Sequence, residues 1–217
     1  MSRIVIILWC CISFSLHAQT PKLENGLENF VVANTIYPIF ALDNCIQGTV
    51  EVAFKIDKQG KITYATVIKS VGADLDAEAL RLIKLTSGKW EVPAGYDTKF
   101  LIRSPMNFSL KGYGCEQINP ATVGLALNRY RDEMITLEKI TTYYKNKEAG
   151  INNSMDDSKI IMLKTELEID DNFLAKKIEI AERKIKQGDL QSACEDFKFV
   201  RYMGSAKADA LIAKYCK

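Results

Sequence analysis

The chain has 217 residues, of which 47% are hydrophobic, and its 29 basic residues almost balance 27 acidic ones, giving a formal net charge of +2. This length and apolar content allow one large domain or two small domains with packed cores. The charge balance argues against nucleic acid or an acidic membrane surface as a partner.

The first 18 residues have the pattern of a secretory signal peptide. Arg3 is followed by the 13 uncharged residues Ile4–Leu16, whereas a bilayer crossing needs about 20 apolar residues. Cleavage after Ala18 would place the chain in the periplasm. The alternative is an uncleaved signal that anchors the chain in the inner membrane. Residues 19–33 are then expected to form a short linker.

Enzymatic chemistry is not expected after export. Cleavage would remove His17, the only histidine, and with it any Ser-His-Asp triad, Cys-His pair or histidine metal ligand. The acidic residues are scattered through amphipathic segments, where a solvated helix face is their expected role. No glycine loop for binding phosphate is present. We therefore predict no catalytic residue, no cofactor, no metal site and no small-molecule substrate.

A β-hairpin is expected near the start of the first domain, which we place at residues 34–115. Apolar and polar side chains alternate through residues 48–57, and this period of two predicts a half-buried strand. Residues 58–61 supply a turn that contains Gly60, a residue suited to positive φ. A second strand is expected over residues 62–71.

A helix and a final strand follow the hairpin. Asp74 is expected to cap a helix whose apolar residues, from Leu75 to Ile83, lie at helical spacing. The last strand is expected over Phe100–Leu110, and Pro105 should place it at a sheet edge or break it, because proline cannot donate to a ladder. The side chains expected to share its inner face are Phe100, Ile102, Met106, Phe108 and Leu110.

This β-β-α-β order, with particular residues at its turns, resembles the C-terminal domain of TonB. The residues that carry the resemblance are Tyr37-Pro38, Gly48-Thr49-Val50, Asp57, Gly60, Lys69-Ser70, Leu75-Asp76, Ala79, Lys89-Trp90, Pro93 and Asn107-Phe108-Ser109-Leu110. The resemblance implies an α+β fold with a three-stranded antiparallel sheet. The chain departs from the family pattern in its flanking cysteines and in the absence of an aromatic residue between Trp90 and Pro93.

The resemblance also implies a mode of binding. TonB domains engage an extended segment of outer-membrane receptors, the TonB box, by adding it to a sheet edge. The residues of the corresponding edge are Phe100, Leu101, Ile102, Arg103, Met106, Asn107, Phe108, Ser109 and Leu110. Among them Leu101, Arg103, Asn107 and Ser109 point outward and would select the partner. The alternative is an ordinary sheet edge that is solvated or covered by the C-terminal region. Tyr37 and Trp90 are expected in the core.

The second region, residues 116–217, is expected to be helical. Asn119-Pro120 is typical of a helix start, and this helix should run to about Lys147. A second helical stretch is expected over Asp157–Gln187, with an interruption near Asp170-Asp171. Its charged residues Lys176, Lys177, Glu179, Glu182 and Lys186 are expected to form a solvated face.

The last part of this region weakly resembles a tetratricopeptide-like helical hairpin. Gly188-Asp189 and Gly204 would form its turns, and Ala193 would lie where the helices cross. A solenoid needs about three such repeats to bury a continuous core, and only one is visible. A small helical bundle is the preferred interpretation.

Four cysteines lie outside the signal peptide, at Cys45, Cys115, Cys194 and Cys216. An even number in an exported chain indicates disulfides, which four cysteines can form in three ways. We favour Cys45–Cys115 and Cys194–Cys216, because each pair brackets one apparent structural unit. A four-cysteine zinc site is the alternative, but it usually requires close C-x-x-C pairs.

Two functions are compatible with these features. The first is a periplasmic TonB-like protein that binds an extended segment of an outer-membrane receptor and is linked to transmembrane transport. The alternative is a structural or assembly adaptor of the cell envelope that acts through its helical region. A homodimer is a further expectation, because exposed edge strands can exchange between copies.

Overall fold

The computed structural model describes residues 20–216, and the expected signal peptide lies outside this range. In chain order its elements are β1 (Lys22–Leu23), α1 (Leu27–Asn34), α2 (Ile39–Asp43), β2 (Gly48–Ile56), β3 (Ile62–Lys69), α3 (Leu75–Leu85), β4 (Trp90–Glu91), β5 (Ile102–Phe108), α4 (Pro120–Glu148), α5 (Asp157–Glu166), α6 (Asp171–Lys186), α7 (Leu190–Tyr202), the 3-10 helix η1 (Ala206–Ala208) and α8 (Asp209–Tyr215). The α+β class is confirmed. No helix within the described range is both long and apolar enough to cross a bilayer.

The three-stranded antiparallel sheet has the order β3-β2-β5, so β2 is its central strand. Phe54 of β2 lies opposite Ala65 of β3 and Ile102 of β5. The apolar residues that alternate along β2 are fully buried, as the period of two predicted. Val50 lies opposite Met106, so the inner faces of β2 and β5 enter the same core.

Helix α3 covers the inner face of the sheet. Leu75, Ala79, Leu82 and Ile83 have no exposed surface, and their spacing along the sequence places them on one side of the helix. They share a hydrophobic cluster with the inner residues of the sheet and with Ala41 of α2. Each buried leucine or isoleucine contributes roughly 1.5–3 kcal/mol.

A linker was expected over residues 19–33, but within the described part of this segment β1 and α1 are formed. β1 pairs antiparallel with β4, with Leu23 opposite Trp90, and Val31 of α1 joins the core. Gly60 allows this arrangement, because it has a φ of +76° and a Cβ there would lie 2.4 Å from the carbonyl oxygen of Trp90. Strands of two residues carry no readable periodicity, so the sequence indicated a linker instead.

Helices α4 to α7 of the C-terminal region begin at side chains that accept a backbone N–H of the first turn. These caps are Asn119 for α4, Asp156 for α5, Asp170 for α6 and Asp189 for α7. Each cap of this kind contributes about 1 kcal/mol. The cap at Asp170 confirms the expected interruption, and Glu168 just before it has a φ of +54°.

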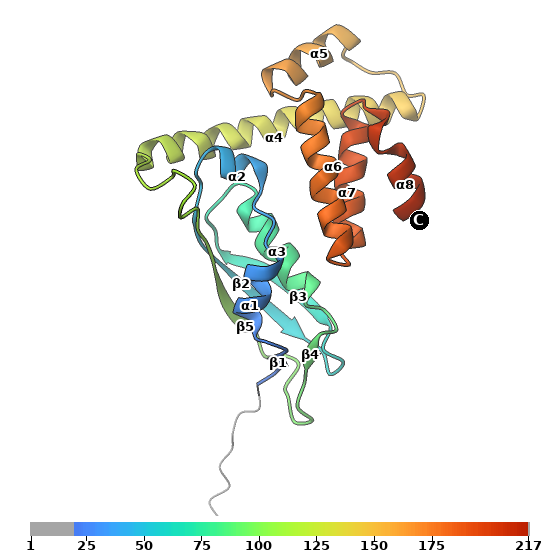
Figure 1. Ribbon diagram of the computed structural model, residues 1–217. Helices are drawn as coiled ribbons and strands as arrows, with labels where there is room; N and C mark the ends of the chain where they lie inside the picture. Colours follow the sequence, from blue (N-terminus) through green and yellow to red (C-terminus); the bar gives the residue numbers. More distant parts are fainter. Residues whose placement is uncertain (1–19, 217) are drawn as a thin grey trace, which may run out of the picture.

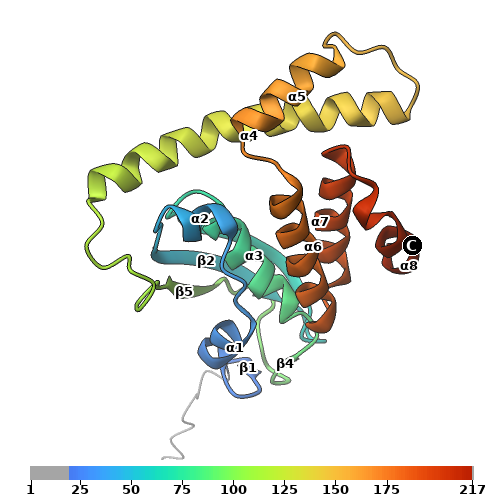
Figure 2. The ribbon, with the colours of Figure 1, turned by 45° about the horizontal axis from the view of Figure 1, so that its top comes forward.

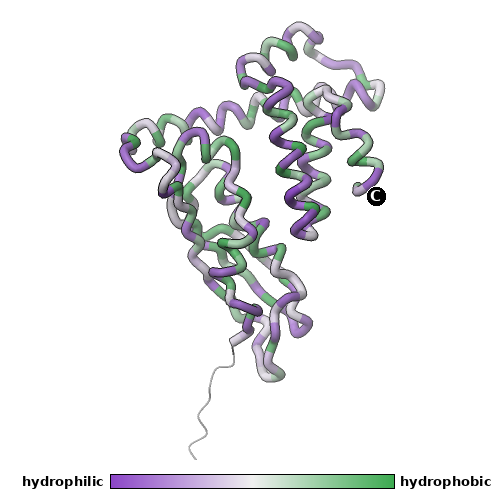
Figure 3. Tube along the Cα trace, in the orientation of Figure 1, coloured by the Kyte–Doolittle hydropathy of each residue, from purple (hydrophilic) through white to green (hydrophobic). Residues whose placement is uncertain are grey.

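Helices α6 and α7 form the hairpin of the helical region, where Ala181 and Ala193 are fully buried. A second hydrophobic cluster surrounds this hairpin and extends to α4, α5 and α8. The disulfide Cys194–Cys216 joins α7 to the residue after α8. Figure 3 shows many hydrophilic residues along α6, and the exposed ones include Lys176, Glu179, Glu182 and Lys186. Lys177 departs from the expected solvated face, because it is half-buried and lies 3.4 Å from Asp196.

Two glycines with the same backbone conformation offer a matched test of this packing. Gly188 and Gly204 both have a φ of +79°, but a Cβ at Gly204 would lie 2.4 Å from the Tyr144 ring, whereas nothing lies within 4 Å of a Cβ at Gly188. We expect Gly188→Ala to lower the free energy of unfolding by about 1–2 kcal/mol, through φ alone. Gly204→Ala should lower the free energy of unfolding by about 2–5 kcal/mol, because the contact of the new Cβ with the Tyr144 ring adds to the same backbone cost. Urea unfolding measures both, and equal losses would contradict the contact with Tyr144.

Candidate functional site

Strand β5 forms one edge of the three-stranded sheet. It pairs with β2 from Phe108 opposite Gly48 to Ile102 opposite Phe54, and no second strand pairs with it in the described part of the chain. In Figures 1 and 2, α6 and α7 lie beside α3, and β5 lies on the other side of the domain. The helical region therefore does not run along β5.

The inner and outer faces of β5 differ as the alternation predicted, with one correction. Met106, Phe108 and Leu110 are 1–3% exposed, so they lie in the core. Phe100 was expected on the same face but is 58% exposed. It lies before β5, and its N–H donates to the carbonyl of Asp97 in a turn.

The side chains on the solvent-facing side of β5 are exposed, and they include one residue that the sequence interpretation omitted. Leu101, Arg103, Asn107 and Ser109 are all exposed. Pro105 lies between Arg103 and Asn107 on the same face and is exposed as well. Its place in the alternation was the signal that could have identified it.

The backbone of β5 presents an incomplete set of donors to a further strand. In an antiparallel pair, successive residues direct their N–H and C=O groups alternately toward the partner and away from it. Leu110 donates its N–H to the side chain of Gln47, just before β2, at 3.1 Å. By this alternation, the N–H groups of Arg103 and Asn107 point away from β2, toward the free edge of the sheet. Pro105 lies between them and has no N–H. The free edge thus offers two donors with a gap between them.

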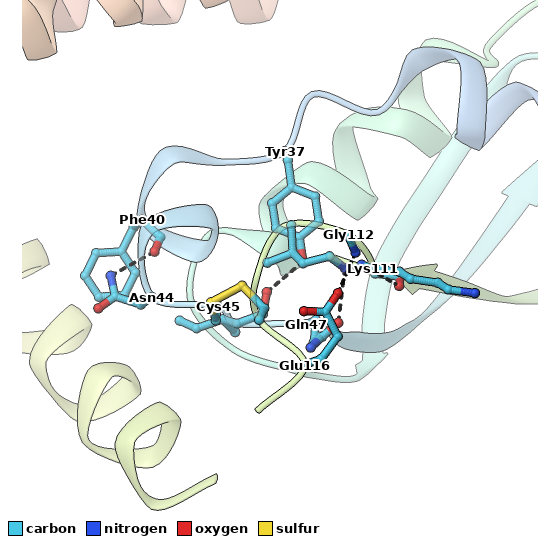
Figure 4. The surroundings of a disulfide bond; sticks show 12 residues. Tyr37, Phe40, Asn44, Cys45, Gln47, Lys111, Gly112 and Glu116 are labelled. Atoms are coloured by element: carbon cyan, nitrogen blue, oxygen red, sulfur yellow. Dashed lines mark hydrogen bonds between the residues drawn. A yellow bond between two sulfur atoms is a disulfide. The ribbon is translucent and has the colours of Figure 1, made fainter. Parts of the chain in front are cut away.

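A disulfide and a tyrosine hold the end of β5 in place (Figure 4). Cys45 and Cys115 form the expected disulfide, with Cα atoms 5.4 Å apart. It closes a 70-residue separation, which corresponds to about 4 kcal/mol in the chain-entropy model. Tyr37 donates its hydroxyl to the carbonyl of Ile46 at 2.7 Å, and its ring meets Phe108 edge-on at 6.1 Å. Tyr37 therefore has the expected structural role.

A buried arginine joins the two regions of the chain. Arg81 of α3, only 7% exposed, forms an ion pair with Glu78 at 2.7 Å and with Asp189 at 3.1 Å. Its guanidinium also donates to Gln187 Oε1 and to the carbonyl of Asn34, each at 2.9 Å. Burial alone would lower the pKa of Arg81, but its hydrogen bonds and charge interactions with Glu78 and Asp189 outweigh burial and raise it.

Beside this junction lies a cavity of about 410 Å³, bounded by α2 and α3 on one side and by α4, α6 and α7 on the other. Asp74 lines it. Asp74 was expected to cap α3, yet its side chain makes no capping hydrogen bond. Its Oδ1 atom is buried and has no hydrogen-bond partner among the described residues. No sequence pattern predicted this cavity, because its walls come from segments that are distant in the chain.

Burial dominates the titration of this carboxyl. It raises the pKa of Asp74 to about 6, although backbone N–H groups and the charge of Lys177 lower it. Burial also raises the pKa of Tyr130 on α4 to about 12, and the charge of Asp74 adds to that shift. Within residues 20–216, no group of three or more His, Cys, Asp or Glu side chains is placed to hold a metal ion.

Comparison with known proteins identifies the first region. Residues 33–110 match the family model described as Gram-negative bacterial TonB protein C-terminal. This match confirms the resemblance read from the sequence. It begins near the end of α1, ends just after β5 and leaves the helical region unmatched. No curated protein and no solved structure matches the chain.

The arginine junction predicts an unequal response of two arginines to the same change. Arg81→Met leaves the Glu78 carboxylate buried without its cation, so we expect a loss of about 3–5 kcal/mol in the free energy of unfolding. Arg201→Met removes an exposed ion pair with Glu148 and should cost at most about 1 kcal/mol. Urea unfolding of both variants measures this. A loss at Arg81 as small as that at Arg201 would show that the junction is not important for stability.

The buried carboxyl predicts a variant that gains stability. The pKa of Asp74 is raised to about 6 in the folded chain, so its ionisation opposes folding above that pH, and the penalty disappears as the pH falls toward 4. Asp74→Asn should therefore raise the free energy of unfolding by about 1–3 kcal/mol at a pH of about 7.5, and the gain should vanish near pH 4. Unfolding curves across this pH range measure it. The exposed Asp43→Asn is the control and should change stability little at any pH.

Proposed function

We propose that this chain, whose residues 33–110 form a TonB C-terminal domain, binds an extended segment of an outer-membrane receptor at the edge strand β5. The family associates the chain with the bacterial cell envelope and with receptor-dependent transport. The finer assignment of partner and binding mode is our proposal, and it depends on the geometry of β5.

The observation that carries the proposal is the unpaired outer side of β5. Its partner β2 occupies one side only, and the disulfide Cys45–Cys115 fixes the chain just beyond its end. An extended peptide on the outer side would receive N–H donors from Arg103 and Asn107 and would meet the carbonyl groups that alternate with them. Each such hydrogen bond contributes about 0.5–1.5 kcal/mol net, so a short segment would bind reversibly.

Side chains on the solvent-facing side of the sheet would set the choice of partner. Arg103 and Asn107 are exposed beside the free edge, with Leu101 and Ser109 beyond them. Arg103 suits a carboxylate side chain on the bound segment, because its guanidinium can donate two parallel hydrogen bonds to the two carboxylate oxygens. Leu101, 37% exposed, offers an apolar contact at the same end.

We place the domain in the periplasm, where it would meet the inner face of an outer-membrane receptor. Whether residues 1–18 are cleaved or retained decides between two roles. A cleaved chain would act as a soluble accessory or as a competitor for the receptor segment. A retained signal would anchor the chain and permit energy transduction from the inner membrane.

Asn107→Pro tests the binding mode directly. This change removes one of the two N–H donors of the free edge and leaves a carbonyl of the bound peptide without its partner, which costs about 1–3 kcal/mol. The affinity for a synthetic TonB-box peptide should therefore fall about 5-fold or more. Fluorescence anisotropy with a labelled peptide, copied from a receptor of the same genome, measures the dissociation constant.

Asn107→Ala is the matched control for this experiment. It keeps the N–H and removes only the side chain, so the affinity should remain within about 3-fold of the original. Circular dichroism checks that both variants are folded. If Asn107→Pro binds the peptide as tightly as the original chain, β5 is not the binding edge.

The adaptor function is a second proposal, supported by the separate hydrophobic cluster and disulfide of the helical region. The two functions differ in their dependence on β5. Affinity capture from envelope extract, with the original chain and with Asn107→Pro, separates them. Partners that are lost with Asn107→Pro favour the receptor function, and partners that are retained favour the adaptor.

A further inference from the structure

The cavity beside Asp74 has the size and lining of a small-molecule site. Its volume of about 410 Å³ lies within the range of roughly 300–1,000 Å³ that is usual for ligand pockets. Apolar side chains from both regions of the chain form much of its wall. They include Phe40, Met134, Leu137, Ile169, Phe173 and Phe199.

Each positive charge in the cavity wall already has an acidic partner, although two lysines share one carboxylate. Arg81 pairs with Glu78 at 2.7 Å. Lys184 lies 2.6 Å from Asp196, and Lys177 lies 3.4 Å from the same carboxylate. An anionic ligand would therefore have to displace an existing partner before it gained one of these cations.

Two acids in this wall lack a salt bridge among the described residues: Glu195, which is exposed, and Asp74, which is half-buried. The Oδ1 atom of Asp74 is also enclosed without a hydrogen bond to any of these residues. Backbone N–H groups of Phe40 and Ala41, at the start of α2, lower the pKa of Asp74, and the charge of Lys177 lowers it as well. Burial outweighs these contributions, so the folded chain carries a desolvated carboxylate at the side of an apolar space.

The other ionisable groups near Asp74 do not neutralise it. Tyr37 and Tyr130 both have pKa values raised to about 12. Burial also raises the pKa of Glu133 on α4, against the opposing effect of Arg129. Among the described residues, Lys177 is the cation that acts on Asp74. The two tyrosines and the glutamate are neutral or negative, so they favour a cation beside this carboxylate.

We propose that this cavity binds a small organic cation, in which an ammonium group on an apolar or aromatic body lies against Asp74. The apolar walls would cover the body of the ligand, and the Asp74 carboxylate would form an ion pair with the ammonium group. A cation held in this low-dielectric space interacts more strongly with a carboxylate than it would in water. Because the walls come from both regions, the ligand would also stabilise their contact by mass action.

The experiment compares three probes of similar shape and different charge on the folded chain with both disulfides formed. They are 2-phenylethylammonium, the neutral 2-phenylethanol and the anionic phenylacetate. Isothermal titration gives the affinities, and ¹⁵N NMR shift changes locate the site. We expect the ammonium to bind saturably, at least about 10-fold more tightly than the alcohol, because a hydrogen bond to a charged group contributes about 1.5–3 kcal/mol. Shift changes should centre on Phe40 and Phe199.

Two variants decide whether Asp74 carries this preference. Asp74→Asn keeps the size of the side chain and should reduce the advantage of the ammonium to less than about 3-fold. Glu195→Gln removes another acid from the cavity wall and should preserve that advantage. The proposal is overturned if the ammonium fails to bind at about 10 mM, if the alcohol binds equally well, or if Asp74→Asn leaves the preference unchanged.

Discussion

The buried Arg81 guanidinium contacts three segments of the chain and joins the two regions, together with the packing of α4 against the first hydrophobic cluster. Arg81 reaches the carbonyl that ends α1, Glu78 on its own helix and the turn between α6 and α7. A guanidinium has donors in a fixed planar geometry, so satisfying all of these acceptors at once fixes the orientation of the helical hairpin on α3. That orientation leaves β5 on the other side of the domain and creates the cavity between the regions. The cavity therefore lies beside this junction, and the edge strand β5 lies away from it.

Two acidic side chains of α3 and its start, Glu78 and Asp74, lie near this junction and differ in their partners. Glu78 also accepts the N–H of Ile36 at 2.8 Å, so its negative charge is satisfied by both a cation and a backbone donor. Asp74, one turn earlier at the start of α3, has no salt bridge among the described residues, and its Oδ1 atom has no hydrogen-bond partner there. A uniform core would place an apolar or amide side chain there, because an unpaired buried carboxylate is destabilising. Such exceptions are more frequent at functional sites than elsewhere.

The elements that sequence alone could predict are those whose residues repeat at a regular spacing. Alternation located β2 and β5, helical spacing located α3, and the break before α6 followed from the pair Asp170-Asp171. Cysteine positions relative to these elements gave both disulfides. The pairing of β1 with β4 could not be predicted, because two-residue strands have no period. Asp74 looked like a helix cap in its local sequence. Its actual surroundings come from α2, α4 and α6, and local sequence carries no information about such distant contacts.

Pro105 has a consequence for self-association of the chain. Two copies of β5 laid side by side in antiparallel orientation would each lack one N–H at this residue, so the joint sheet would forgo two ladder hydrogen bonds. A foreign strand beside a single β5 forgoes only one. At about 0.5–1.5 kcal/mol for each bond, this asymmetry disfavours pairing between identical edges relative to pairing with another chain. The proline thereby reduces edge-to-edge aggregation, a recurrent hazard of open sheets, and still leaves the edge accessible to a partner.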